Sequence, residues 1–259
     1  MKKCTLCNER VADKLNSHII PKFMCKRLFE GTNPRHSVQL SKDGKQLKIQ
    51  DVPKEDNIFC KQCENRFAKL ESYFSRVLID INSLQNATRK YDIEHSEVQD
   101  ILRCIDITPS LFHLFFYSLL WRASISKHIL FDTFKIGSEV QKELRIFLNQ
   151  NLCDTQEHLL LHAKTITEIP TYHTCFIKPK NNARGIFSAY NFAPNGFAVF
   201  TVDYALFFYT KGDDCLPAHK TYGNIDNEII KIVLANDENW KHLNNAVVEN
   251  MLQYHSANL

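Results

Sequence analysis

Two Cys-x-x-Cys pairs constrain the fold of this chain more than any other feature of its sequence. The first pair is Cys4 and Cys7, and the second is Cys60 and Cys63. Each pair can bind a metal ion from a single tight turn, and together they supply the four thiolates of a tetrahedral zinc site. Because a closed shell of four cysteines leaves no open coordination position, we expect this Zn²⁺ to be structural and not to react.

Length and composition set the outer limits. With 259 residues, 44% of them hydrophobic, the chain can bury one sizeable core and a smaller second unit. Its most apolar stretch, residues 111–121, is too short to span a membrane and contains His113, so we expect a buried helix there. We call the turn formed by each cysteine pair a knuckle. Lys2 and Lys3 lead directly into the first knuckle without an apolar leader. Nine cysteines in such a chain favour the reducing cytoplasm.

The charge is unevenly distributed. Residues 1–90 contain 18 Lys and Arg against 10 Asp and Glu, whereas the remaining residues contain 14 against 19. The excess positive charge therefore lies with the cysteine pairs, where it would attract a polyanion such as DNA. A solvated, lysine-rich surface explains the same charge equally well.

Local patterns predict an α+β fold in two parts. In residues 1–84, alternate apolar residues around Asp43-Gly44 predict a hairpin between Val38 and Val52. Apolar residues repeating at three and four positions predict a helix from the second knuckle to about Asn82. Pro21 restricts helix in residues 15–29 to the C-terminal part of that segment.

Residues 85–259 have a different pattern, which predicts helices followed by an antiparallel sheet. Thr108-Pro109 should start a helix that runs to Phe131, and Ser138 should start another. Short β-branched and aromatic runs predict strands at 159–166, 174–177, 185–190, 197–202 and 205–209. Residues 227–234 and 239–254 are expected as closing helices.

No nucleotide-binding or nucleophile motif occurs in residues 85–259. We therefore expect this part to present a surface for a protein partner or a second copy of the chain, or to shape a substrate channel. Arg122, His128, His173 and Arg184 could contact a ligand, although a partly buried arginine bound to carbonyl groups is the simpler interpretation.

Taken in order, the residues of the first part resemble the HNH endonuclease family in its zinc-stapled form with a ββα-metal core. The matching pieces are the two cysteine pairs, Ser17-His18-Ile19-Ile20-Pro21, Asn57 and Glu64-Asn65. The resemblance covers residues 1–80. It implies a nuclease module at 1–84, an accessory domain at 85–259 and hydrolysis of DNA phosphodiester bonds, often in defence against phage or in mobile elements.

The same resemblance implies roles for single residues. His18 would act as the general base, and Asn57 would brace the loop. A catalytic Mg²⁺ or Mn²⁺ would stabilise the charge on the leaving oxygen. Glu64 is the best candidate ligand for that cation, and Ser17 and Asn65 are further candidates for binding it.

Two positions depart from the family pattern. Ser17, a neutral hydroxyl, stands where the family usually has a metal ligand, and Glu64 stands where it has Asn or His. In one interpretation, a metal ligand has been lost at Ser17 and a carboxylate has been gained at Glu64, on the other side of the same site. In the other, the site has become a zinc fold without catalysis that binds nucleic acid or scaffolds a protein complex. Glu71 is expected to be a surface charge or a partner of Arg66 or Lys69.

Overall fold

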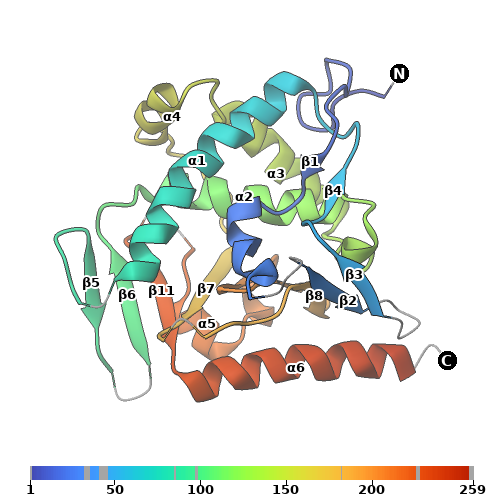
Figure 1. The fold of residues 1–259 in the computed structure, drawn as a ribbon. Coiled ribbons are helices and arrows are strands. Elements are labelled where there is room, and N and C mark those ends of the chain that lie inside the picture. Colours follow the sequence, from blue (N-terminus) through green and yellow to red (C-terminus); the bar gives the residue numbers. More distant parts are fainter. Residues whose placement is uncertain are drawn as a thin grey trace.

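The computed structural model describes residues 2–31, 36–40, 46–84, 86–96, 99–181, 183–225 and 228–256. Within them, a seven-stranded sheet lies between two layers of helices (Figure 1). The fold is α+β, as the sequence predicts. In spatial order the strands are β5 (Tyr91–Glu94), β6 (Asp100–Cys104), β11 (Ile230–Ala235), β7 (His173–Pro179), β10 (Tyr204–Tyr209), β9 (Gly196–Thr201) and β8 (Ser188–Ala193). Neighbouring strands are antiparallel except β11 and β7, which are parallel.

Both faces of the sheet are buried, and strands β9, β10 and β11 are apolar at nearly every position. Side chains alternate between faces along a strand. In β7, Phe176 belongs to one core cluster, whereas Cys175 and Ile177 belong to the other. In β10, Leu206 and Phe207 divide in the same way. Such strands read as continuous apolar runs, which is the pattern of a sheet covered on both sides.

The first face of the sheet is covered by α2 (Pro109–Ile125), whose residues from Ser110 to Ser124 are all buried. It begins at Thr108-Pro109, as predicted, but it ends before the expected Phe131, and a short 3-10 helix, η2 (Ile129–Phe131), follows. Around α2 lie α1 (Lys61–Ser83), α3 (Ser138–Asn151) and α4 (Gln156–Ala163). The rings of Phe74 in α1 and Phe115 in α2 stack with centroids 4.2 Å apart.

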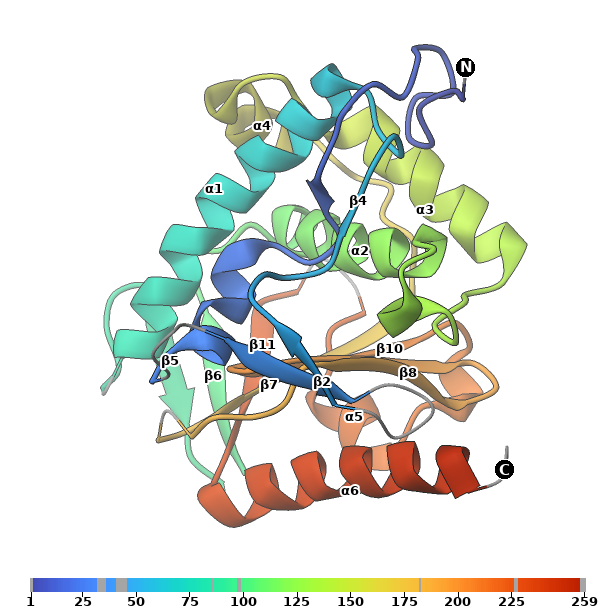
Figure 2. The ribbon, with the colours of Figure 1, turned by 45° about the vertical axis from the view of Figure 1, so that its right-hand side comes forward.

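The opposite face of the sheet is covered by α6 (Asp237–Ser256), as Figure 2 shows from a second side. Trp240 and Val247 of α6 belong to the same core cluster as Phe207 and Tyr209 of β10. The remaining short elements, η3 (Gly212–Asp214) and α5 (Pro217–Tyr222), connect β10 to β11. In the part of the chain that the structure describes, no helix combines the length and the apolar character needed to cross a bilayer.

The N-terminal region is built around a very short pair of strands, β1 (Ser17–His18) and β4 (Lys54–Glu55), which are antiparallel. Between them the chain forms a 3-10 helix, η1 (Lys22–Phe29), and a separate hairpin of β2 (Ser37–Leu40) and β3 (Gln46–Ile49). The predicted hairpin is therefore present, although its turn, Asp43-Gly44, lies outside the described residues. The predicted helix after the second knuckle is α1.

Two predictions for the second part are wrong. Residues 159–166 were expected as a strand but lie largely in α4, where the Thr155 hydroxyl caps the helix by accepting from the His158 N–H at 3.2 Å. Residues 227–234 were expected as a helix, but Ile230–Ala235 form β11 in the middle of the sheet. Short apolar runs do not distinguish a buried strand from a buried helix by periodicity.

One core cluster joins the two halves of the sequence. It contains Cys4 and Phe59 from the N-terminal region, Trp121 from α2 and Leu234 from β11. The ring of Trp121 stacks on Phe59 at 5.9 Å and on Phe67 at 6.5 Å. The base of the zinc-binding region therefore rests directly on α2.

Candidate zinc centre and the adjoining histidine site

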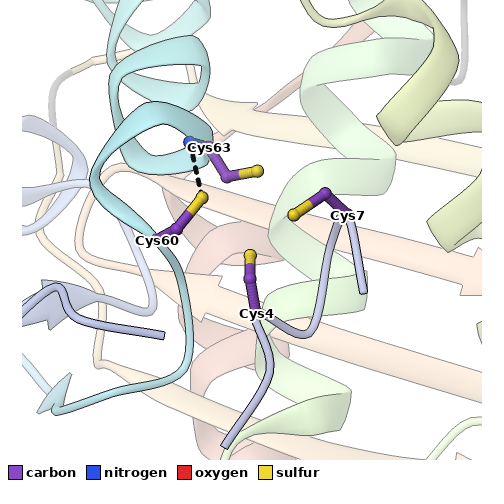
Figure 3. A group of neighbouring side chains, drawn as sticks. All are labelled: Cys4, Cys7, Cys60 and Cys63. Atoms are coloured by element: carbon purple, nitrogen blue, oxygen red, sulfur yellow. Dashed lines mark hydrogen bonds between the residues drawn. The ribbon is translucent and has the colours of Figure 1, made fainter. Parts of the chain in front are cut away.

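The structure brings the four predicted cysteines together. Cys4 and Cys7 lie in the N-terminal loop, Cys60 and Cys63 lie at the start of α1, and the four sulfur atoms point toward one another (Figure 3). The four Sγ atoms all lie within 4.8 Å of one another, and all four residues are buried. Zn–S bonds of about 2.3 Å in a tetrahedron require sulfur atoms about 3.8 Å apart. The four cysteines can therefore hold a structural zinc ion after a small inward adjustment.

The first knuckle is a tight turn closed by main-chain hydrogen bonds. The Cys4 N–H donates to the Arg10 carbonyl at 2.8 Å, and the Asn8 N–H donates to the Cys4 carbonyl at 2.9 Å. Asn8 has φ of 58°, in the left-handed region that Asn tolerates better than most residues. The Thr5 N–H donates to the Ile58 carbonyl at 2.9 Å, which fixes this turn beside the second knuckle.

The second knuckle coincides with the start of a helix. Cys60 is the N-cap of α1, and its sulfur accepts from the Cys63 N–H at 3.4 Å. The positive end of the helix favours a thiolate at this place. The sequence Cys-x-x-Cys therefore starts the helix and supplies two metal ligands at once.

The charges around the cluster also suit a thiolate site. A hydrogen bond from the Cys63 side chain, together with main-chain N–H groups, lowers the pKa of Cys4 to about 4 against the effect of burial. The same contact raises the pKa of Cys63. Loss of water contact would lower the pKa of Arg10, but the hydrogen bond that its guanidinium donates to the Cys60 sulfur, together with the charges of Cys60, Cys7 and Cys63, raises it. Arg10 thus places a cation beside the sulfur atoms.

His18 lies on β1, which is paired with β4. Its pKa is lowered by burial and by Lys54, while Asp51 and Glu71 act in the opposite direction. The imidazole is therefore neutral at pH 7, the state that can accept a proton. Residue pairing holds His18 opposite Lys54 on β4.

Ser17 and Glu64 lie together at the base of α1. Burial raises the pKa of Glu64, whereas Arg122 and the Ser17 hydroxyl lower it. The Ser17 hydroxyl is nevertheless buried without a hydrogen bond among the described residues that meets ordinary distance and angle limits. A carboxylate beside a hydroxyl offers oxygen ligands of the kind that Mg²⁺ and Mn²⁺ prefer. Among the described residues, however, only the four cysteines form a group of three or more potential His, Cys, Asp or Glu ligands.

Asn57 and Asn65 lie apart from this pair. Asn57 has φ of 57°, and its main-chain N–H donates to the Lys14 carbonyl at 2.8 Å, so the loop before the second knuckle is braced through its backbone. The Asn65 amide donates to the carbonyl of Asp154, in the connection between α3 and α4, at 3.4 Å. The structure therefore brings Ser17 and Glu64 together and places the Asn65 side chain against a different element.

Two residues that the sequence did not assign to the site are Arg122 and Glu71. Arg122 was expected to bind carbonyl groups, and it does donate to those of His18 and Ser118, both at 3.2 Å. It also pairs with the Glu71 carboxylate at 2.6 Å, so Glu71 is neither a simple surface charge nor a partner of Arg66. The signal that could have found this pair is the single charged residue in the apolar run of α2, because a buried charge needs a partner.

Three polar atoms in this region are buried without a hydrogen-bond partner in the described part of the chain. They are Ser17 Oγ, His18 Nε2 and Arg122 Nη2. Buried polar groups in folded proteins are nearly always paired with protein, water or an ion. Their concentration where β1, α1 and α2 meet marks this junction as a polar site inside an otherwise apolar core.

Comparison with known proteins found no match, whether to protein-family models, to curated proteins or to solved structures. The resemblance to HNH endonucleases therefore rests on the motif residues alone. Of its implications, the geometry supports the zinc-binding arrangement of Cys4, Cys7, Cys60 and Cys63.

Proposed function

We propose that this chain is a metal-dependent endonuclease that hydrolyses phosphodiester bonds of DNA. The observation that supports this most directly is the position of His18. A neutral imidazole lies on a strand that is paired with β4 and held beside a helix whose first turn carries two of the four zinc ligands. Two paired strands and a helix that carries zinc ligands resemble the arrangement of a ββα-metal nuclease.

His18 takes the role of general base in this proposal. A neutral histidine can remove a proton from water and so produce a nucleophile that attacks phosphorus. Its lowered pKa keeps it unprotonated at neutral pH, and the acidic residues Asp51 and Glu71 nearby favour the protonated form that the reaction produces. In the structure Nε2 is buried, so substrate binding must admit water to the imidazole.

Glu64 and Ser17 are the residues that would hold the catalytic cation, Mg²⁺ or Mn²⁺. When bound, such a cation stabilises negative charge on the leaving oxygen. Glu64 offers the carboxylate, and the unpaired Ser17 hydroxyl offers a neutral oxygen next to it. With a single carboxylate, this site would bind its cation weakly, so we expect activity to require millimolar metal.

Lysines beside His18 support an anionic substrate. Both Lys54 and Lys22 are close enough to affect the pKa of the imidazole. Lys22 is exposed at the start of η1. A cation at this position can neutralise a backbone phosphate and release a counterion.

The test is a plasmid-nicking assay with purified protein in Mg²⁺ or Mn²⁺, comparing the wild type with His18→Ala, Glu64→Gln and His95→Ala. His95 is the matched control, because its side chain is 69% exposed and pairs with Asp100 on β6, away from the zinc region. We expect His18→Ala to lose activity by roughly 100-fold or more, the size of a general-base contribution, Glu64→Gln to lose activity because it binds the cation more weakly, and His95→Ala to retain activity. Undiminished cutting by His18→Ala would remove His18 from the mechanism.

A second candidate is a zinc module without catalysis that binds nucleic acid or scaffolds a protein complex. The burial of His18 Nε2 favours it, because a general base must reach water. The same assay separates the two functions. If no metal supports cutting while DNA still shifts on a gel, and the shift weakens steeply with salt, the second candidate replaces the first.

A further inference from the structure

The arginine of α2 connects three parts of the candidate nuclease site. Arg122 Nη1 donates to the Glu71 carboxylate at 2.6 Å and to the His18 carbonyl at 3.2 Å, so a single nitrogen joins α1, α2 and β1. Its Nε donates to the Ser118 carbonyl within α2 at 3.2 Å. The residue is 2% exposed.

The orientation of the guanidinium is fixed from two directions. Its central carbon lies over the ring of Phe67, 4.9 Å from the centroid, in a cation–π contact. The hydrogen bonds in its own plane go to a carboxylate and to two carbonyl groups. A lysine in this position would keep the charge but would lose the planar fork and the stacking.

Arg122 pairs with one acidic residue of α1 and not with another. Glu71 is paired with the guanidinium. Glu64 lies seven residues earlier on the same helix, and among the described residues no ion pair joins it to Arg122. Glu71 is thereby neutralised, while the Glu64 carboxylate remains available to a cation.

From these contacts we infer that Arg122 is the positioning residue of the site. It holds the main chain of His18 in place and keeps Glu71 away from the cation, so that α2, outside the zinc-stapled region, completes the nuclease site. This inference rests on the proposed function. It assigns to the second part of the chain a role in the reaction, since the histidine strand consists of only two residues and its His18 carbonyl accepts a hydrogen bond from α2 in addition to the pairing with β4.

The variants that test this inference are Arg122→Met, Arg122→Lys and Arg66→Met. Methionine keeps an unbranched stem over Phe67 and removes the charge. Arg66 is the matched control, because it is a half-buried arginine that, like Arg122, binds carbonyl groups, those of Leu152 and Asn149, but it lies on the side of α1 facing α3. Because Arg122→Met leaves Glu71 without its partner, the double variant Arg122→Met/Glu71→Gln keeps the test valid if the single variant does not fold.

Two measurements are needed. The first is the steady-state rate of DNA cutting, in which we expect Arg122→Met to lower kcat by roughly 10- to 100-fold at unchanged KM, as for a misplaced catalytic group. Arg122→Lys should recover part of kcat, and Arg66→Met should retain it. The second is the NMR signal of the His18 ring carbon Cε1, which should move in Arg122→Met and stay in place in Arg66→Met. The absorption of Co²⁺ bound in place of zinc should be the same in all folded variants.

The NMR measurement keeps this inference separate from the proposed function. If the wild type cuts no DNA, the nuclease proposal fails, and the His18 signal alone decides whether Arg122 positions the strand. A wild-type kcat together with an unmoved His18 signal in Arg122→Met would overturn the inference.

Discussion

Replacing Cys60 tests the zinc centre most sharply, because this residue has two separable functions. Its sulfur is one of four that lie within 4.8 Å of one another, and it also caps α1 by accepting from the Cys63 N–H. Cys60→Ser removes the metal ligand but keeps an oxygen that can cap the helix. Cys60→Ala removes both. The two variants therefore divide the contribution of the metal from that of the cap.

The metal and the helix cap are expected to contribute to the folding free energy in a ratio of about ten to one. Structural zinc contributes about 10 kcal/mol or more to the folding of small zinc domains, whereas a whole domain is stable by only about 5–15 kcal/mol. A helix cap contributes about 1 kcal/mol. We therefore expect Cys60→Ser to lose bound zinc and to unfold the region that includes Cys4, Phe59 and the start of α1. Cys60→Ala should be less stable than Cys60→Ser by about 1 kcal/mol.

The assays are zinc content per chain, urea unfolding and limited proteolysis. Cys104→Ala is the matched control, since Cys104 is 1% exposed in β6 and burial raises the pKa of its thiol to about 12. It should retain its zinc and lose only about 1 kcal/mol for the small cavity. The reasoning is refuted if Cys60→Ser binds a full equivalent of zinc, or if it unfolds at the same urea concentration as the wild type.

Two further predictions concern the core. Burial lowers the pKa of His219 to about 4, and its Nδ1 is hydrogen-bonded with the Tyr209 hydroxyl at 2.6 Å. Because the folded pKa lies below the ordinary value of about 6.5, the contribution of His219 to stability is complete above that value and is lost as the pH falls toward 4. Between about pH 7.5 and 4.5 the free energy of unfolding of the wild type should therefore fall by about 2–3 kcal/mol more than that of His219→Gln in urea titrations; equal pH dependence in the two proteins would contradict this. Phe74→Ala, which removes a 1% exposed ring stacked on Phe115, should cost about 3–5 kcal/mol in the same titrations, and a loss below about 1 kcal/mol would show that α1 does not pack on α2 as described.

The sequence predicts what is encoded locally. The cysteine spacing indicates both knuckles, and the repeat of apolar residues after Cys63 indicates α1 to within a residue or two of its end. Thr108-Pro109 marks the start of α2 by its capping pattern. These features depend on neighbours within a few positions, so a single sequence is enough to identify them.

What the sequence could not show depends on tertiary contacts. Strand β11 lies between β6 and β7, and its apolar run is explained only by burial on both faces of the sheet. The pair between Arg122 and Glu71 joins residues 51 positions apart. The partner of the His18 strand was also not foreseen, because β4 follows an unrelated hairpin. In each case the missing information is which distant segments meet.

The separation of β1 from β4 along the chain has a consequence for how this protein can vary. The cost of closing a loop grows only slowly with its length, by about 0.6 kcal/mol for each doubling. The pairing of Ser17 with Glu55 and of His18 with Lys54 fixes the two ends, and Met24, Cys25 and Phe29 anchor η1 in the core. Insertions or deletions in the hairpin of β2 and β3 should therefore be tolerated. The surface that this hairpin presents could diverge between related chains while the histidine strand stays unchanged.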